Sequence, residues 1–424
     1  MLLFLNPTRG LTRIPAATDG STMTTRSQRM DQSNRAALRR RLICIAVLGA
    51  MLLSRSGAQS APAGTTAEIE KCFREFAGLS DDQIRDIRNS RAVAKVLESP
   101  TADEVFVFGA VYINSTPERY FTLAADIDEL RKLPSFIALQ KFSIPPQISD
   151  LDEFVLDERD LKELQQCKPA HCDVQLPTEV IDQFQRTVNW SAPDRAAQAN
   201  RLAQRMALEA VRRYQQGGNV ALGTYRDKSR PTAVAETFAS LLDGMKALPV
   251  YLPELQRYLL DYPNDKSDQI QSEFYWEKVN FGLKPTLRIV QSIVYRGASA
   301  DRPAYAVAVK QLYASHYFET ALDLTVCVSD TADKRGGFYL ITVKGSKQAG
   351  LTGLKGGIVR KVALDKTRSS LQKVLAEYRR RLESPSSKTL TRQPAQEVRA
   401  QRQLGAAFGC DAKSGTSLVQ PLRD

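Results

Sequence analysis

The sequence predicts an α+β fold, in which an antiparallel sheet of about seven strands packs against a long C-terminal helix and is interrupted by a helical insertion. Two strand-like stretches, 104–113 and 136–142, precede the insertion, and five more follow in close succession after residue 272. A long amphipathic pattern over 354–382 then predicts one helix. Between these parts, residues 147–270 carry helical rather than alternating patterns.

Two short helices are predicted before the first strand, over 66–76 and 81–97. Ser80, with Gln83 three residues later, forms the capping-box pattern that starts the second helix. Residues 104–113 alternate and are rich in Val, Phe and Tyr, which are residue types that favour strands. The chain is therefore expected to enter its sheet from a pair of helices.

In the insertion, helical patterns cover 178–188, 192–216, 232–248 and 253–262. The longest of these stops at Gly217 and Gly218, as expected for a helix that ends at glycine. The insertion lacks the composition of a linker at the junction of an independent domain. We therefore expect it to pack on the sheet.

The strands after the insertion are predicted at 273–279, 285–295, 303–314, 317–328 and 337–343. In the second, one face is formed by Leu287, Ile289, Ile293 and Tyr295, and the other by Val290 and Val294. The third places Tyr305, Val307, Val309 and Tyr313 opposite Ala304, Ala306 and Ala308. Strands that are apolar on both faces are covered on both faces. We expect the final helix on one face and the insertion near the other.

The predicted organisation has four parts. Residues 1–60 are a signal peptide with an upstream extension, 61–103 are N-terminal helices, 104–383 are the main domain with the insertion at about 143–270, and 384–424 are a tail. The tail is polar and rich in Gln, Arg and Ser, a composition typical of disorder.

The N-terminal region has the pattern of an export signal. Arginines at 39–41 are followed by an apolar run over 42–53 and by small residues over 56–60, so cleavage is expected between Ser60 and Ala61. The run of twelve apolar residues is shorter than the roughly 20 that span a membrane. The sequence therefore predicts a periplasmic or secreted protein, not an integral membrane protein. The adjacent arginines also allow twin-arginine export, and the start residue stays open among Met1, Met23 and Met30.

The net charge of +12 does not indicate nucleic-acid binding. Residues 1–60 carry nine Arg and two Asp, and residues 384–424 carry six basic and three acidic side chains. A net charge of only +2 is left for 61–383. A nearly neutral body argues against a phosphate-binding surface, so no nucleic-acid partner is expected.

The cysteines are interpreted in the light of export. In an oxidising compartment, Cys167 and Cys172 are the natural disulfide, because only four residues separate them. His171 lies in this loop, so a Cys-His-Cys metal site is the alternative, but zinc would lack a fourth ligand there. The disulfide is favoured, and no metal or cofactor is predicted. The pairing of Cys72 with Cys410 stays open.

The order of elements, with the segment 111–121 (VYINSTPERYF) running from the first strand into a helix at Pro117, resembles the START-like (SRPBCC, helix-grip) superfamily. The resemblance covers about 104–142 and 271–383, and the long insertion departs from it. It implies a curved antiparallel sheet wrapped on the C-terminal helix. It also implies an internal cavity between sheet and helix that receives an apolar small molecule. The cysteine loop also looks like a feature of uncharacterised exported bacterial proteins.

His316 is the weak catalytic candidate. It lies in the turn between two predicted strands, and Glu319 and Asp323 follow at alternating spacing as its candidate partners. The alternative, which we favour, is a histidine hydrogen-bonded within a hairpin. No serine lies in a G-x-S-x-G elbow, so no Ser-His-Asp arrangement can be argued.

Aromatic residues are the candidate ligand contacts, namely Tyr305, Tyr313, Trp276 and Tyr317. A basic glycine-rich stretch at 345–357 precedes the last helix and is a candidate for phosphate or for anionic lipid headgroups. The sequence favours an exported carrier of a hydrophobic or amphipathic, lipid-like small molecule. Two alternatives are a cyclase- or hydrolase-type enzyme that uses His316 and a non-catalytic envelope interaction protein.

Overall fold

The computed structural model describes residues 66–133, 135–245, 252–265, 267–280, 284–297, 305–330, 333–351 and 353–384. The predicted signal peptide with its cleavage site, Cys410 and nearly all of the predicted tail lie outside the described residues.

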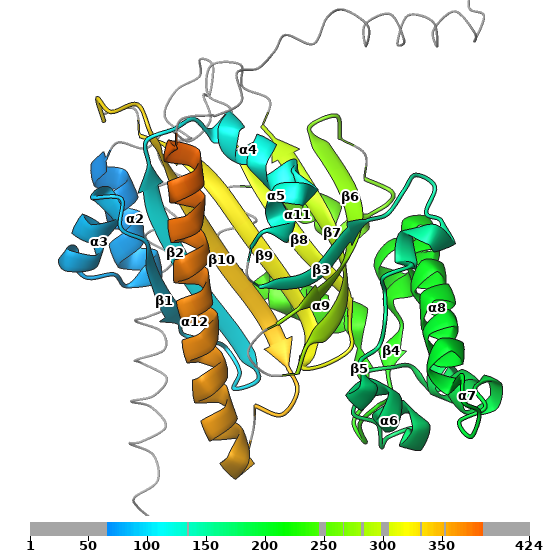
Figure 1. Cartoon of the computed structure of the whole chain (residues 1–424). Helices are drawn as coiled ribbons and strands as arrows, with labels where there is room; N and C mark the ends of the chain where they lie inside the picture. The colour runs from blue at the N-terminus through cyan, green and yellow to red at the C-terminus, as the bar shows by residue number, and fades with distance from the viewer. Residues whose placement is uncertain are drawn as a thin grey trace, which may run out of the picture. The chain divides into compact units, whose positions relative to one another are not determined.

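One large antiparallel sheet of eight strands organises the described chain (Figure 1). Its strands are β1 (Val93–Leu97), β2 (Glu104–Ile113), β3 (Phe136–Lys141), β6 (Ile270–Val279), β7 (Thr286–Arg296), β8 (Tyr305–Ala314), β9 (Phe318–Ser329) and β10 (Phe338–Gln348). They lie in the order β1-β2-β10-β9-β8-β7-β6-β3. A separate ribbon pairs β4 (Thr224–Tyr225) with β5 (Thr232–Ala233). The predicted α+β class with a large antiparallel sheet is thus confirmed.

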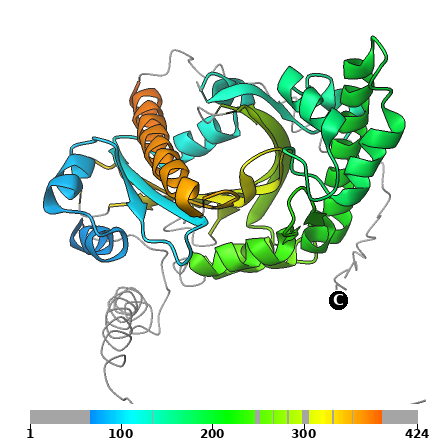
Figure 2. The same ribbon diagram turned by 90° about the horizontal axis from the view of Figure 1, so that it is seen from below.

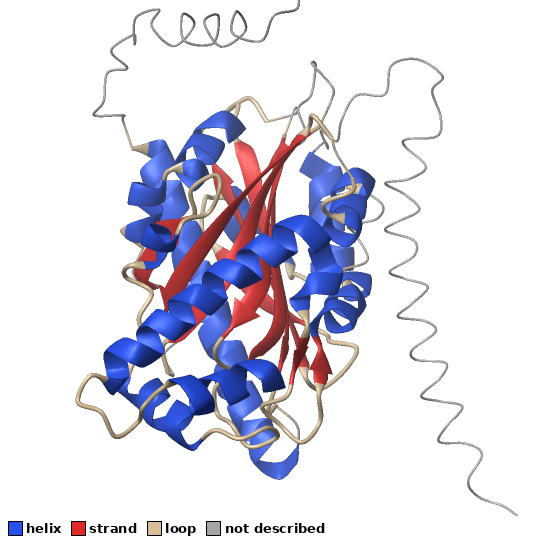
Figure 3. Ribbon diagram, turned by 90° about the vertical axis from the view of Figure 1, so that its right-hand side faces the viewer, coloured by secondary structure: helices blue, strands red, loops and turns tan. Residues whose placement is uncertain are grey.

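Helices lie on both sides of the strands (Figure 3). They are α2 (Thr66–Ala77), α3 (Asp81–Arg88), α4 (Pro117–Ala125), α5 (Ile127–Arg131), α6 (Glu158–Gln166), α7 (Thr178–Thr187), α8 (Arg195–Gly217), α9 (Val234–Gly244), α11 (Pro253–Asp261) and α12 (Gly353–Glu383). Two 3-10 turns, η1 (Ile148–Leu151) and η2 (Gly218–Leu222), flank parts of the insertion. No helix among the described residues is long and apolar enough to cross a membrane.

The predicted helix over 81–97 is wrong in its second half. The capping box of Ser80 and Gln83 does start α3, but the helix ends at Arg88. Ser90 has a positive φ of 60°, which turns the chain, and β1 then pairs with β2. The Val-rich stretch of β1 favours a strand, and its pairing makes the sheet eight-stranded rather than seven-stranded.

The C-terminal helix α12 packs on β1 and β2, at one end of the sheet. Gly109 of β2 permits this close approach, because a Cβ there would lie 2.7 Å from Leu375 and 2.8 Å from Leu371. Leu371 and Leu375 belong to the same buried cluster as Val107 and Val111 of β2. The large apolar side chains of α12 thus fit against a strand that has no side chain at this point.

The opposite face of the sheet is covered by the insertion and, over β1, β2 and β10, by α2 and α3 (Figure 2). There α9 and α11 form a buried cluster with Ile293 of β7 and Leu322 of β9, and α8 packs against Ile289 of β7. Val294, on the other face of β7, packs with the α12 cluster instead. The prediction that both faces are covered is therefore confirmed, as is the alternation along β7.

The predicted face of Tyr313 is wrong because β8 contains an irregularity. Ile289 pairs with Tyr313, whereas Val290 pairs with Gln311, so Leu312 is an extra residue in the ladder. Such a β-bulge reverses the alternation beyond it. Tyr313 consequently packs with Ile289 on the insertion side, whereas Tyr305 stays on the α12 side.

Candidate functional site

A cavity of about 160 Å³ lies between the helices α7 and α8 and the strands β7 and β8, and we call it the insertion cavity. Its inner lining is apolar and comprises Phe154, Leu156, Leu164, Val174, Leu176, Phe184, Met206, Val211, Leu222, Leu287, Ile289 and Leu312. The aromatic rings of Tyr225 and Tyr313 complete it, with their centroids 6.3 Å apart. The cavity thus lies on the side of the sheet opposite to α12.

Small residues on α8 account for this space. Ala203, Ala207 and Ala210 line the cavity and recur at the i, i+4 and i+7 spacing that places side chains on one helical face. Across from them, Leu287 and Ile289 project from β7. Because alanine ends at Cβ, these side chains do not bridge the distance between helix and sheet, and the gap stays open.

Polar side chains form the rim of the insertion cavity. Glu179, Gln183, Glu209 and Arg213 line it and are exposed to solvent. Arg213 lies 3.9 Å from Glu209 in an i, i+4 ion pair on α8. An apolar interior with a charged rim suits a molecule with an apolar body.

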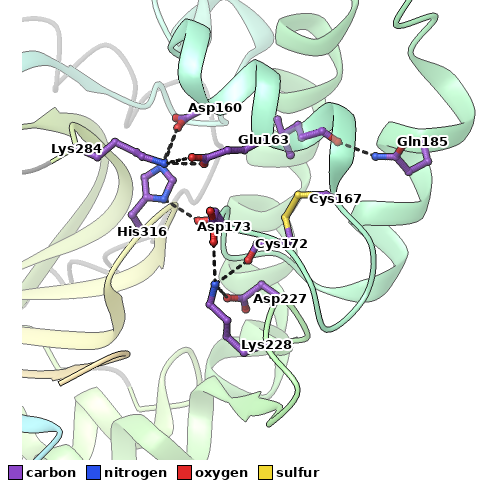
Figure 4. Close-up of a disulfide and its surroundings, with 11 residues drawn as sticks. Asp160, Glu163, Cys167, Cys172, Asp173, Gln185, Asp227, Lys228, Lys284 and His316 are labelled. Atoms are coloured by element: carbon purple, nitrogen blue, oxygen red, sulfur yellow. Dashed lines mark hydrogen bonds and ion pairs between the residues drawn. A yellow bond between two sulfur atoms is a disulfide. The ribbon is translucent and has the colours of Figure 1, made fainter. Parts of the chain in front are cut away.

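A cluster of buried charged groups lies beside this cavity (Figure 4). Nε2 of His316 lies 2.9 Å from Oδ1 of Asp160, and the two side chains are 3% and 2% exposed. Nδ1 of His316 lies 2.9 Å from the backbone oxygen of Asp173. Lys284 extends into the same group, with Nζ at 2.5 and 2.6 Å from the carboxylate oxygens of Glu163.

Two contacts hold the His316 ring in place. A backbone carbonyl only accepts hydrogen bonds, so Nδ1 of His316 donates to Asp173. Nε2 lies within hydrogen-bond distance of the Asp160 carboxylate, so both ring nitrogens of His316 are engaged.

Asp160, Glu163 and His316 also have the ligand types of a metal site, with ligand atoms within 4.8 Å of one another. Lys284 argues against this use, because its ammonium group bonds Glu163 and lies 3.9 Å from Asp160. Both carboxylates thus already have partners, Glu163 in Lys284 and Asp160 in His316. A divalent cation would have to displace these charges, so we assign the cluster a structural role.

The disulfide between Cys167 and Cys172 is present in the structure, with the Cα atoms 4.5 Å apart. The two sulfurs are bonded to each other, so the Cys-His-Cys metal alternative is wrong, and His171 is exposed. Cys167 follows α6, which carries Asp160 and Glu163, and Cys172 precedes Asp173. The disulfide therefore joins the segments that supply both hydrogen-bond partners of His316.

A fully buried lysine lies in the core beneath α9 and α11. The side chain of Lys310 is fully buried, and Nζ donates to the Tyr214 hydroxyl at 3.0 Å and to the Leu259 carbonyl at 3.2 Å, with Asn219 as a third acceptor. It also lies 4.1 Å from the centre of the Phe238 ring. Burial lowers the pKa of Lys310 to about 7.

The proposed acidic partners of His316 are wrong. Asp323 forms an ion pair with Lys344 on the α12 side of the sheet. The two ring nitrogens of His316 contact Asp173 and Asp160, not Glu319. Burial raises the pKa of Glu319. The bulge and the turn around Tyr317, whose φ is 65°, direct His316 toward α6 instead. Asp160, the actual partner, is 156 positions from His316 in the sequence. The only sequence signal for its burial is its position on the amphipathic helix α6.

Of the four predicted ligand aromatics, only Tyr313 lines the insertion cavity. Trp276 is fully buried, donates from Nε1 to the Asp150 carbonyl at 2.7 Å and packs against Phe154. The hydroxyl of Tyr305 donates to Glu118 at 3.1 Å, on the α12 side. The hydroxyl of Tyr317 accepts from the backbone of Lys284 at 3.1 Å. These three residues have structural contacts of their own.

At the basic glycine-rich stretch, Lys344 just before it and Lys347 within it have acidic partners. Lys344 pairs with Asp323, and Lys347 lies 3.4 Å from Asp103. The side chain of Lys355 lies outside the described residues. The pairing of Lys344 and Lys347 reduces the positive charge that either a phosphate or a lipid headgroup would meet here.

Comparison with known proteins does not assign the chain to a family. No protein-family model matches the chain, and no curated protein matches it. The START-like resemblance therefore stays a prediction, and function has to be argued from the site itself.

Proposed function

We propose that this chain is an exported, non-catalytic protein that binds a small apolar or amphipathic molecule in the insertion cavity. The observation that carries the proposal is the lining, which is apolar inside and polar only at the rim. The rim residues Glu179 and Arg213 would meet solvent and the polar end of the ligand.

An enzyme would need reactive groups that converge on this space. His316 does not line the cavity, and both of its ring nitrogens are engaged by Asp173 and Asp160. A general base needs a free nitrogen within hydrogen-bond reach of its substrate. The geometry therefore favours the carrier over the cyclase- or hydrolase-type alternative.

Export remains part of the proposal and rests on the leader pattern before Ala61. The disulfide supports it, because such bonds persist in the periplasm and outside the cell and are rare in the cytosol. The START-like relation is also proposed, since α12 packs on a large antiparallel sheet. The ligand space that we propose, however, lies under the insertion rather than under α12.

Native mass spectrometry of the periplasm-purified protein tests the function directly. We expect a bound small molecule, which solvent extraction releases. Ala203→Phe, which places a ring in the cavity, should abolish this adduct. Ala197→Phe on the exposed side of the same helix is the matched control and should keep it.

Three findings together would contradict the carrier proposal: a wild-type protein that carries no small molecule, no binding of a fluorescent fatty acid and no binding of toluene. An adduct that survives equally in Ala203→Phe and Ala197→Phe would instead place the ligand elsewhere.

A further inference from the structure

We infer that the insertion cavity takes a compact cyclic molecule with one uncharged hydrogen-bond acceptor, and that the Tyr313 hydroxyl recognises this acceptor. The inference rests on the proposed function and narrows its ligand class. It follows from the size of the cavity, from the state of the Tyr313 hydroxyl and from the charges near it.

The size of the cavity suits a single ring. An engineered protein cavity of about 150 Å³ lined by Leu, Ile and Phe binds benzene. The insertion cavity has about 160 Å³ and a similar lining, to which Phe154 and Phe184 contribute aromatic surface. A sixteen-carbon fatty acid has about three times as many heavy atoms as benzene, so it would not fit without displacing side chains.

Tyr313 supplies a hydrogen-bonding group to this apolar space. Its side chain is half-buried and lines the cavity, and its hydroxyl has no hydrogen-bond partner among the described residues. The neighbouring hydroxyl of Tyr225 also has no hydrogen-bond partner among the described residues, but it is completely buried, so a molecule in the cavity does not reach it. An unpartnered hydroxyl in an apolar cavity favours a ligand that completes its hydrogen bond.

The surrounding charges decide which kind of group can bind there. Burial raises the pKa of Tyr313 well above its ordinary value, and the negative charges of Asp160 and Asp227 add to this effect. The hydroxyl therefore keeps its proton and acts as a donor. The same negative charges disfavour a carboxylate at this place, so the acceptor is expected to be a neutral carbonyl, ether or ring nitrogen.

Four probes test this class on the full mature chain by ligand-observed NMR titration: acetophenone, toluene, benzoate and palmitate. We expect acetophenone to bind more tightly than toluene, and benzoate and palmitate to bind weakly or not at all. Tyr313→Phe removes only the hydroxyl and should weaken acetophenone binding about fivefold, while toluene changes by less than about twofold. Tyr305→Phe, on the α12 side of the sheet and outside the cavity lining, is the matched control and should leave both affinities unchanged.

Each other outcome is decisive. Palmitate binding without acetophenone or toluene binding overturns the compact-ligand inference but leaves the carrier proposal standing. Equal acetophenone affinity in the wild type and Tyr313→Phe overturns the role of Tyr313. Failure of all four probes, together with an empty protein in native mass spectrometry, overturns the carrier proposal itself. Retained toluene binding shows that Tyr313→Phe is folded, so loss of acetophenone alone is interpretable.

Discussion

Nε2 of His316 and Oδ1 of Asp160 lie 2.9 Å apart, although the two residues are separated by 156 positions. Both side chains are almost fully buried, so their contact is shielded from water. This contact ties the turn before β9 to the helix α6, and the disulfide at the end of α6 fixes the same segment.

Removing Asp160 should be strongly destabilising. Asp160→Ala leaves Nε2 of His316 without a partner in the core and should lower the free energy of unfolding by about 3 kcal/mol. Urea unfolding measures this change. Gln165→Ala, at an exposed position of the same helix, should change stability by less than about 0.5 kcal/mol. A double variant with His316→Ala that shows strict additivity would contradict the contact.

Loss of the disulfide should cost about 2 kcal/mol, as expected for a short closed loop. Reduction should also raise the intact mass by about 2 Da, because each sulfur gains one hydrogen atom, with the electrons supplied by the reductant. The variant Cys167→Ser/Cys172→Ser should show the same lowered stability without responding to reductant. If reductant destabilised this variant as much as the wild type, another bond would be responsible.

Lys310 should make stability rise with pH. Its pKa is about 7 in the folded protein, whereas an ordinary lysine titrates near about 10.4. Between these values the unfolded chain binds more protons, so the free energy of unfolding increases with pH. From pH 7 to pH 9 we expect a gain of about 2 kcal/mol in urea unfolding. Lys310→Met should remove this rise, and an unchanged slope in that variant would assign it to other groups.

Gly109 on β2, facing α12, and the exposed Gly357 within α12 should respond with opposite sign. Gly109→Ala would place its Cβ 2.7 Å from Leu375, so we expect a loss of about 2 kcal/mol. Gly357→Ala meets nothing within 4 Å inside a helix and should stabilise by up to about 1 kcal/mol. Thermal unfolding of both variants gives the comparison. A neutral Gly109→Ala would mean that α12 does not pack this closely.

Local patterns predicted most of the sheet but not its irregularities. The alternation of Ile289 and Val290 correctly assigned the two faces of β7, because side-chain direction follows directly from the strand period. The extra residue Leu312 carries no composition signal, so the reversed direction of Tyr313 was not predictable. The short strand β1 was assigned to a helix because its pairing with β2 is a tertiary interaction.

The candidate site was predicted only in part, for a related reason. The disulfide follows from close spacing, whereas Tyr313 was expected in a cavity under the C-terminal helix and lines a cavity on the opposite face of the sheet. The cavity, however, depends on how α8 approaches β7, and the partner of His316 depends on where α6 lies. Neither distance is encoded in a local pattern.

The pairing of β2 with β10 restricts how the protein can be made. Ile113 pairs with Phe338, so β2, near the start of the described region, can pair with β10 only after the chain near the end of that region has been made. The covering helix α12 comes later still. A nascent chain that stops before residue 338 cannot complete the sheet, and its β2 stays without this neighbour. Such distant pairings are slow to form, so productive folding begins only when synthesis is nearly finished.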